Sequence, residues 1–235
     1  MKKLALTVAS ALVLASAANA AMEGKHFTGF YVGGQLGYGS GKSEWSHRAT
    51  AAGIAAGNPN SRKVDLGTRG VLGGLHVGFG KEFNNKMYLG LEAFGNLSKT
   101  EGKENSVQGA TIFRSKANRK HEFGAALRPG FVCGNALLYV KAGISSAKWE
   151  YKQAYHTNGV LLDRSNTTKH RVAFVPGLGV SFLASEHVVF GVEATHTMYK
   201  KQNTPVRAVV GGAVNEVGRV KTHVTDFTGR VSYKW

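Results

Sequence analysis

The sequence predicts an all-β protein, an eight-stranded antiparallel transmembrane β-barrel that follows an N-terminal signal peptide. Three observations lead to this prediction. Successive segments alternate apolar side chains with polar or small ones, which is the pattern of strands that separate two different environments. Short turns alternate with long polar connections, as they do in barrels that stand in a membrane. The chain also begins with an export signal.

The export signal occupies the start of the chain. Two lysines precede an apolar run over residues 4–15, and Ala18-Asn19-Ala20 ends the segment. A basic start, a short apolar core and small residues at the end predict a signal peptide over residues 1–20 and a barrel domain over residues 21–235. No later run approaches the roughly 18 apolar residues of a membrane helix. The single cysteine, Cys133, excludes an intramolecular disulfide framework.

Eight strands follow from the alternation of side chains. In the first, Phe30, Val32 and Leu36 face one way, and Gln35 faces the other way among glycines. The predicted strands are Thr28–Ser40, Gly70–Phe83, Met87–Ser98, His121–Val132, Ala136–Tyr151, Val172–Leu183, Val188–Tyr199 and Thr222–Trp235. Short turns span residues 84–86, 133–135 and 184–187, and long connections span residues 41–69, 99–120, 152–171 and 200–221. With an even number of strands, both ends of the barrel domain are expected on the periplasmic side, and the long connections outside the cell.

The apolar face of each strand is expected to point outward, toward lipid. A soluble barrel would hold its apolar side chains inside and its polar side chains in water, and it stays as the alternative. The opposite faces carry glycines and long charged side chains, which fit together in the narrow interior of eight strands. The side chains predicted to face lipid include Leu75, Leu91, Val140, Phe174 and Val192.

A layer of charged side chains is predicted in the barrel interior. Five charged residues lie at similar distances from the short-turn ends of their strands, with a glutamine nearby. They are Gln35, Glu92, Arg128, Lys141, Glu193 and Arg230. Three cations and two anions in a narrow interior must pair, because isolated buried charge is unstable. Two interpretations stay open: a gate in an ion path, and a packed polar core that stabilises the fold.

The terminal strand resembles the closing strand of bacterial outer-membrane β-barrels. It carries apolar side chains at every second position and ends on an aromatic residue, although Phe is commoner there than Trp. The residues concerned are Phe227, Val231, Tyr233 and Trp235. The resemblance implies that the barrel-assembly machinery reads this strand.

The whole barrel domain resembles the outer membrane protein A-like β-barrel superfamily, with its small OmpX-like members and the porin-like surface proteins of α-proteobacteria. The segments Thr28–Gly34 and Gly90–Ala93 look like the first and third strands of that superfamily. The resemblance implies a monomer in the outer membrane, with charged clusters inside and without the peptidoglycan-binding domain of larger relatives.

No constellation of catalytic residues is found, so we expect no enzyme activity. His196-Thr197-Met198 is the nearest match to the His-x-Ser pair of deacylase barrels, but it lacks the serine and points toward lipid. Glu101 and Glu104 have no partner histidine of the kind that barrel proteases use. No cofactor is expected. Three histidines leave haem or metal binding open as an alternative to single solvated side chains: His47, His156 and His223.

The formal net charge is +16, of which +14 remains once residues 1–20 with their two lysines are removed, and this excess of +14 lies in the four long connections. Clustered Lys and Arg attract anions and form charge-assisted bonds to phosphate. Candidate anion-binding residues are Arg62, Lys63, Lys116, Arg119, Lys120, Lys200, Lys201, Arg207, Arg219 and Lys221. An exported protein does not normally meet nucleic acid, so the expected partner is the phosphate of lipopolysaccharide in the surrounding outer-membrane lipid. Sulfated glycans of a host cell, or no fixed partner, are the alternatives.

These observations predict a non-enzymatic outer-membrane surface protein that contributes to envelope structure and interacts through basic extracellular loops. Two alternatives from other functional classes remain. One is a narrow porin-like channel for ions or small solutes, and the other is a host-surface adhesin that binds anionic glycans.

Overall fold

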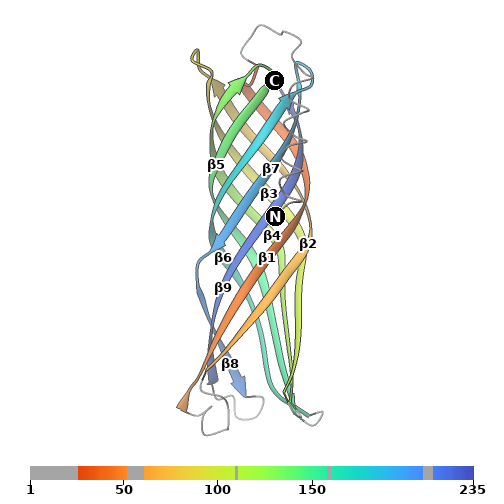
Figure 1. Cartoon of the computed structure of the whole chain (residues 1–235), viewed down its shortest axis with the longest axis vertical. Coiled ribbons are helices and arrows are strands. Elements are labelled where there is room, and N and C mark those ends of the chain that lie inside the picture. The colour runs from red at the N-terminus through yellow and green to blue at the C-terminus, as the bar shows by residue number, and fades with distance from the viewer. Residues whose placement is uncertain (1–25, 52–60, 109–110, 158–159, 209–213) are drawn as a thin grey trace, which may run out of the picture.

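The computed structural model describes residues 26–51, 61–108, 111–157, 160–208 and 214–235, which form one closed sheet (Figure 1). The predicted signal peptide, residues 1–20, lies outside the described residues. The strands are β1 (Gly29–Ala49), β2 (Ser61–Glu82), β3 (Met87–Gln108), β4 (Thr111–Cys133), β5 (Ala136–Thr157), β6 (Val160–Leu183), β7 (Val188–Tyr199), β8 (Gln202–Ala208) and β9 (Val214–Lys234).

The strands close into an eight-stranded antiparallel barrel. Consecutive strands pair from β1 to β7, β9 pairs with β7, and β1 pairs with β9 to close the sheet. β8 lies between β6 and β9, as β7 does, so these two form one barrel strand that is interrupted at Lys200 and Lys201. The predicted fold class is therefore confirmed. No helix among the described residues is long and apolar enough to cross a membrane.

The strands extend much farther than the sequence predicts. β1 continues to Ala49 and β2 begins at Ser61, although the sequence predicts a connection over residues 41–69. The other three predicted connections are also built largely from strands, and the long hairpins point toward the lower end of the barrel in Figure 1. The prediction of four long polar loops is therefore wrong, because long β-hairpins take their place.

The outer surface is apolar over the part of the barrel where the sequence predicts strands, and we call this part the membrane section. Exposed large apolar side chains lie on every barrel strand, with Leu36 and Leu97 more than 70% exposed. All five side chains predicted to face lipid are exposed: Leu75, Leu91, Val140, Phe174 and Val192. The inner surface carries polar and charged side chains among glycines, which is the arrangement of a barrel in lipid.

The polarity of the two surfaces is reversed beyond the membrane section. The outer surface there carries exposed charged side chains such as Lys42 and Asp65. The interior at this height holds an apolar cluster of Leu66, Ala117, Ala147, Trp149, Tyr151, Ala173, Tyr199, Val220 and Val224. Burial of apolar surface stabilises this outer section as it would a soluble barrel. The reversal is also why these segments resemble polar loops in the sequence.

A second apolar cluster closes the short-turn end of the barrel. Phe27 precedes β1 and turns inward, and its backbone N–H donates to Glu82 Oε2 at 3.3 Å. The cluster consists of Phe27, Tyr88, Val132, Leu137, Tyr139 and Leu183. Two tight turns near it use the left-handed region, with φ of 64° at Lys86 and 58° at Gly134.

Candidate functional site

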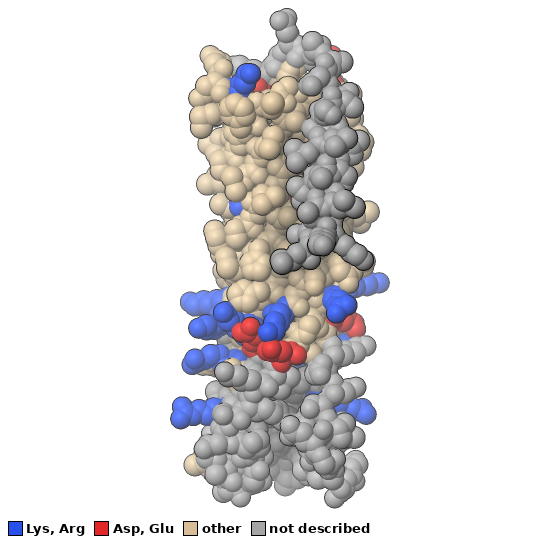
Figure 2. All heavy atoms as spheres, viewed as in Figure 1, with Lys and Arg blue, Asp and Glu red and all other residues tan. Residues whose placement is uncertain are grey.

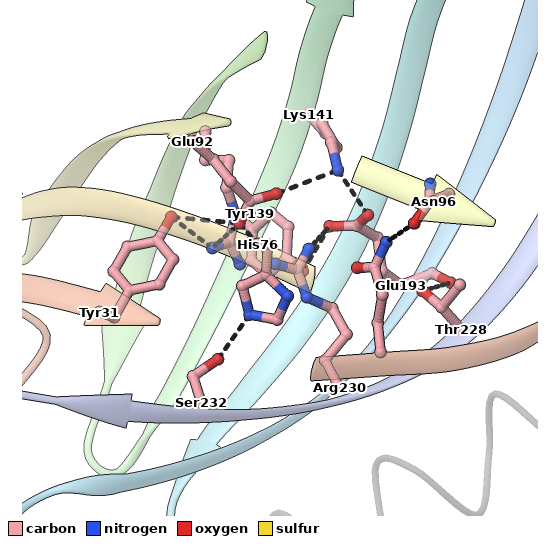
Figure 3. Close-up of polar contacts among 12 residues, drawn as sticks. Tyr31, His76, Glu92, Asn96, Tyr139, Lys141, Glu193, Thr228, Arg230 and Ser232 are labelled. Carbon is pink, nitrogen blue, oxygen red and sulfur yellow. Dashed lines mark hydrogen bonds and ion pairs between the residues drawn. The ribbon is translucent and has the colours of Figure 1, made fainter. Parts of the chain in front are cut away.

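Five charged side chains meet at the centre of the membrane section, and we call them the lumenal layer. Glu92 on β3 contacts Arg128 Nη1 at 3.0 Å and Lys141 Nζ at 3.2 Å. Lys141 also contacts Glu193 Oε1 at 2.8 Å, and Arg230 contacts both glutamates. Figure 3 shows Lys141 between the two carboxylates. Each of the five is at most 5% exposed, so three cations and two anions pair inside the barrel.

Aromatic side chains complete the lumenal layer by hydrogen bonding to its carboxylates and stacking on Arg128. The Tyr31 hydroxyl donates to Glu92 Oε2 at 3.2 Å, and the Tyr139 hydroxyl donates to Glu193 Oε2 at 2.9 Å. The Arg128 guanidinium lies 3.8 Å from the centre of the Tyr139 ring. Aromatic faces attract cations, so this stacking stabilises the arginine in addition to its ion pair. The network is thus hydrogen-bonded on several sides.

Gln35, which the sequence predicts beside the lumenal layer, forms a separate hydrogen bond. Its Nε2 donates to Asn96 Oδ1 at 2.6 Å. His76 also lies inside the barrel, where its Nε2 is 2.8 Å from Ser232 Oγ (Figure 3). Neither His76 nor the two lumenal tyrosines is predicted in the layer from the sequence. The alternation of side chains could have identified these three residues as lumenal, because each occupies an inward position of a predicted strand.

A second buried ion pair lies closer to the hairpin end. Arg119 donates from Nη1 and Nη2 to the two carboxylate oxygens of Asp226, each at 2.8 Å, and Glu122 lies 3.6 Å from Nη1. The sequence predicts Arg119 in an anion-binding loop, and this prediction is wrong because the side chain is 1% exposed. A register shift between Arg119 and Glu122 breaks the two-residue period and turns both side chains inward.

A fourth buried arginine lies within the apolar cluster of the outer section. Arg171 donates to the Tyr151 hydroxyl at 2.5 Å, to Thr222 Oγ1 at 2.9 Å and to the Lys200 carbonyl at 2.7 Å. Trp149 and Tyr199 pack edge to face beside it. Together with the lumenal layer and the cluster at the short-turn end, these side chains fill the interior at several heights.

A ring of outward-facing cations marks the boundary between the membrane section and the outer section. Each barrel strand contributes one, and we call the ring the cationic belt: Lys42, Arg69, Lys99, Lys120, Lys148, Lys169, Lys200 and Lys221. On the face drawn in Figure 2, Lys and Arg gather together with Asp and Glu in a band beyond the largely tan section, and further Lys and Arg lie past that band.

Some belt cations have carboxylate partners. Lys42 contacts Asp65 at 2.8 Å, and the hydrogen bond and charge of this carboxylate raise the pKa of the lysine. Lys120 lies 3.7 Å from Glu150. For Lys148, Lys169 and Lys200, the described side chains provide no carboxylate within 4.0 Å. The belt therefore keeps positive charge at the height where an apolar outer surface ends.

The ten candidate anion-binding residues fall into four groups. Lys120, Lys200 and Lys221 belong to the belt. Lys116, Lys201 and Arg219 lie farther out, and Lys116 contacts Glu101 at 3.5 Å. The side chains of Arg62, Lys63 and Arg207 lie outside the described residues, and Arg119 is the lumenal residue described above.

The four terminal-strand residues all point outward. Phe227, Val231, Tyr233 and Trp235 are between 44% and 63% exposed. The Trp235 backbone N–H donates to the Phe30 carbonyl at 3.0 Å, so the last residue is held against β1. Their role as an assembly signal stays a prediction.

The histidines do not form a metal centre in the described part of the chain. His223 stacks on His196 on the outer surface, with ring centres 5.7 Å apart. The side chains of His47 and His156 lie outside the described residues. Among the described residues, no group of three or more His, Cys, Asp or Glu side chains could hold a metal ion.

Solved structures similar to this chain include the outer membrane protein OprG from Pseudomonas aeruginosa, at 13% identity and TM-score 0.47, covering 90% of this chain and 98% of that one. The outer membrane protease OmpT from Escherichia coli is similar at 9% identity and TM-score 0.46, covering 91% and 99%. Ail of Yersinia pestis is similar at 12% identity and TM-score 0.35, covering 86% and 99%.

No curated protein matches the chain. The family model described as outer membrane protein beta-barrel domain matches residues 7–234, which is nearly the whole sequence. The closed eight-stranded barrel and its apolar outer surface agree with that description. The chain therefore belongs to the outer membrane protein β-barrel family, and it resides in the bacterial outer membrane.

Proposed function

We propose that this protein is a non-enzymatic structural component of the outer-membrane surface, held in the outer leaflet by its cationic belt. The observation that carries the proposal is the belt itself, one outward cation from each barrel strand at the edge of the apolar surface. We expect the phosphates of lipopolysaccharide at this height, because the apolar outer surface ends there. Lys and Arg form charge-assisted hydrogen bonds to phosphate, so the belt provides partners around the whole circumference.

The filled interior supports a structural role over a pore. The lumenal layer pairs its charges with each other, and apolar clusters lie on both sides of it. The cavity beside Tyr31, Arg128 and Arg230 has a volume of about 30 Å³, which is room for roughly one water molecule. An ion would have to displace buried pairs and lose hydration at the same time, which is unfavourable.

A second candidate function is adhesion to sulfated glycans. Outward cations continue beyond the belt at Lys116, Lys201 and Arg219, toward the hairpin end of the barrel. Such a surface attracts a long polyanion in solution. Binding of the purified protein to immobilised heparin, in competition with free lipopolysaccharide, separates the two candidates: retention on heparin in the presence of excess lipopolysaccharide favours adhesion.

The direct test of the proposal neutralises part of the belt. The variant carries Lys99→Gln, Lys148→Gln, Lys200→Gln and Lys221→Gln, and binding to vesicles with and without lipid A is measured at increasing salt. Each lysine near an anionic membrane surface contributes about 1 kcal/mol, so binding should weaken strongly and lose much of its salt dependence.

A control variant changes charge at the other end of the barrel. Lys81→Gln and Lys86→Asn alter exposed residues at the short-turn end, and Asn tolerates the positive φ of Lys86. This control should bind lipid A as the parent does. Equal binding by the parent and the belt variant would contradict the proposal.

A further inference from the structure

A glycine-floored depression lies on the lipid-facing surface of the membrane section, across four adjacent barrel strands. Its floor consists of Gly34, Gly73, Gly95 and Gly229, which lie on β1, β2, β3 and β9. Its walls are Leu36, Leu75, Leu97, Phe123 and Val231. Its volume is about 790 Å³. We call this depression the glycine groove.

Glycines and large side chains alternate over the groove in two neighbouring rows. In one row, Val231, Gly34, Leu75, Gly95 and Phe123 face each other across successive strand pairs. In the next row, the order is Gly229, Leu36, Gly73 and Leu97. Every glycine is thus flanked by large apolar side chains. Leu36 and Phe123 reach toward Gly73 and Gly95, whereas the positions above Gly34 and Gly229 are open.

The packing of the protein itself does not require glycine throughout the groove. A Cβ atom added at Gly34 or Gly229 would meet only a carbonyl oxygen at 3.9 Å, which is ordinary contact. Inward glycines differ, since a Cβ at Gly33 would clash with the Val231 carbonyl and one at Gly78 with the Tyr31 ring. Glycine weakens a strand interior, so the outward glycines leave space at the expense of strand stability.

Cations of the belt lie at the extracellular edge of the groove. Gly73 pairs with Leu97 and Val71 pairs with Lys99, so Lys99 is a diagonal neighbour of Gly73 on the same face. Diagonal neighbours are about 7–8 Å apart, which an extended lysine side chain spans. Arg69 is the next outward residue of β2 after Val71. A lipid acyl chain in the groove would therefore have these cations next to its headgroup end.

We propose that the glycine groove binds one molecule of a phosphorylated, multiply acylated glycolipid of the outer leaflet. One acyl chain packs over the glycines between Leu36 and Leu75, and a phosphate of the same molecule accepts hydrogen bonds from Lys99 and Arg69. This inference rests on the proposed function, because it assigns the preferred position of a lipid that the belt attracts.

A second copy of this chain fits the groove less well. Another copy in the same membrane carries its own cationic belt at the same height, so contact through this face would bring like charges together. The anionic lipid is electrostatically complementary to the same cations. Membrane lipid covers the groove whether or not the glycolipid is bound, so binding does not remove apolar surface from water. The groove therefore selects its ligand through close packing and through the charge of the headgroup.

The test fills the groove and measures lipid binding to the full purified protein by native mass spectrometry. The groove variant carries Gly34→Leu and Gly229→Leu, the two positions with open space above them. Gly67→Leu is the matched control: Gly67 faces outward on β2 beyond the belt, and an added Cβ there meets nothing within 4 Å. The probes are hexaacylated lipid A, its dephosphorylated form and inorganic phosphate. Heat-modifiable gel migration verifies that each variant is folded.

The groove variant is expected to bind lipid A roughly tenfold more weakly, and dephosphorylated lipid A should bind the parent protein weaker by a similar factor. Gly67→Leu should bind as the parent does, and inorganic phosphate should not compete. Unchanged lipid A binding by the groove variant overturns the inference, as does a covalently cross-linked dimer in the parent that the groove variant loses.

A comparison of single belt variants separates this inference from the proposed function. Lys99→Gln should weaken lipid A binding more than Lys148→Gln, which lies on β5 away from the groove. Equal losses in the two variants would show a belt that binds phosphate without a preferred position, so the inference would fail and the proposed function would stand. No loss in either variant would overturn both.

Discussion

Replacement of Glu92 by Gln tests whether the lumenal layer stabilises the barrel. The Glu92 carboxylate is 1% exposed and contacts Arg128, Lys141 and Arg230. Gln preserves the shape of the side chain but removes one of two negative charges that face three cations. Unit charges about 4 Å apart interact by roughly 4 kcal/mol at an effective dielectric constant near 20. We expect the free energy of unfolding to fall by about 3–5 kcal/mol, the usual effect of breaking a buried pair.

Urea unfolding in phospholipid vesicles, read as the folded fraction on unheated gels, measures this loss. Glu186→Gln is the matched control, since Glu186 is exposed on a short turn, and it should change the free energy of unfolding by less than about 0.5 kcal/mol. A second substitution, Arg128→Met or Lys141→Met, removes a cation together with the anion. The double variants should recover part of the loss, with a coupling energy of about 0.5–3 kcal/mol.

Coupling energies near zero for Glu92 with both Arg128 and Lys141 would refute the reasoning, because residues in contact must couple. Conductance in planar bilayers decides between the two interpretations of the layer. A packed polar core predicts that Glu92→Gln lowers stability and leaves conductance unchanged. A gate predicts that conductance rises in the same variant.

Three further predictions concern the other surfaces of the barrel. Leu91→Arg places a charge on the lipid-facing side and should destabilise the barrel by about 2–4 kcal/mol near the midplane; unchanged folding in bilayers would contradict the assigned orientation. Asp226→Asn leaves the buried Arg119 without its bidentate partner and should cost about 3–5 kcal/mol in urea unfolding; a loss below about 1 kcal/mol would show that Glu122, 3.6 Å from Arg119, is a sufficient partner for its charge. Replacement of Tyr233 and Trp235 by Ser should lower the amount of folded protein in the outer membrane without reducing export, and normal surface levels would argue against an assembly signal.

Alternation was sufficient to predict the membrane section. Two-residue periodicity survives wherever one face meets lipid, so Leu91 and Val140 are assigned outward and Glu92 and Lys141 inward from the sequence alone. Long charged residues among glycines on one face are also visible in a sequence. They indicate a narrow, polar interior, where the glycines leave room for the charged side chains. Alternation does not give the relative height of inward residues along the barrel axis. For that reason Gln35 is grouped with the charged layer, although it pairs with Asn96.

The second ion pair could not be predicted because its signal depends on a local break in the period. Asp226 falls on the inward face by alternation, but Arg119 lies in a segment that reads as a polar loop. A register shift after Arg119 then places Arg119 and Glu122 on the same side of the sheet. Neither the shift nor the continuation of β4 to Thr111 follows from composition, since the strand there exposes polar residues and buries small ones such as Ala117.

The reversal of polarity changes how the basic residues can bind anions. Cations on flexible loops lose conformational freedom when they gather around an anion, and that loss reduces affinity. Belt residues such as Lys148 instead sit on strands that are hydrogen-bonded on both sides, with the β4 and β6 backbones as neighbours. The apolar cluster around Trp149 and Tyr199 fills the interior at the same height and supports these strands. Folding therefore fixes the backbone positions of these cations, and only their side chains remain to be ordered by a phosphate. A ring of cations placed in this way is better suited to a layer of lipid phosphates than to a ligand that approaches from solution.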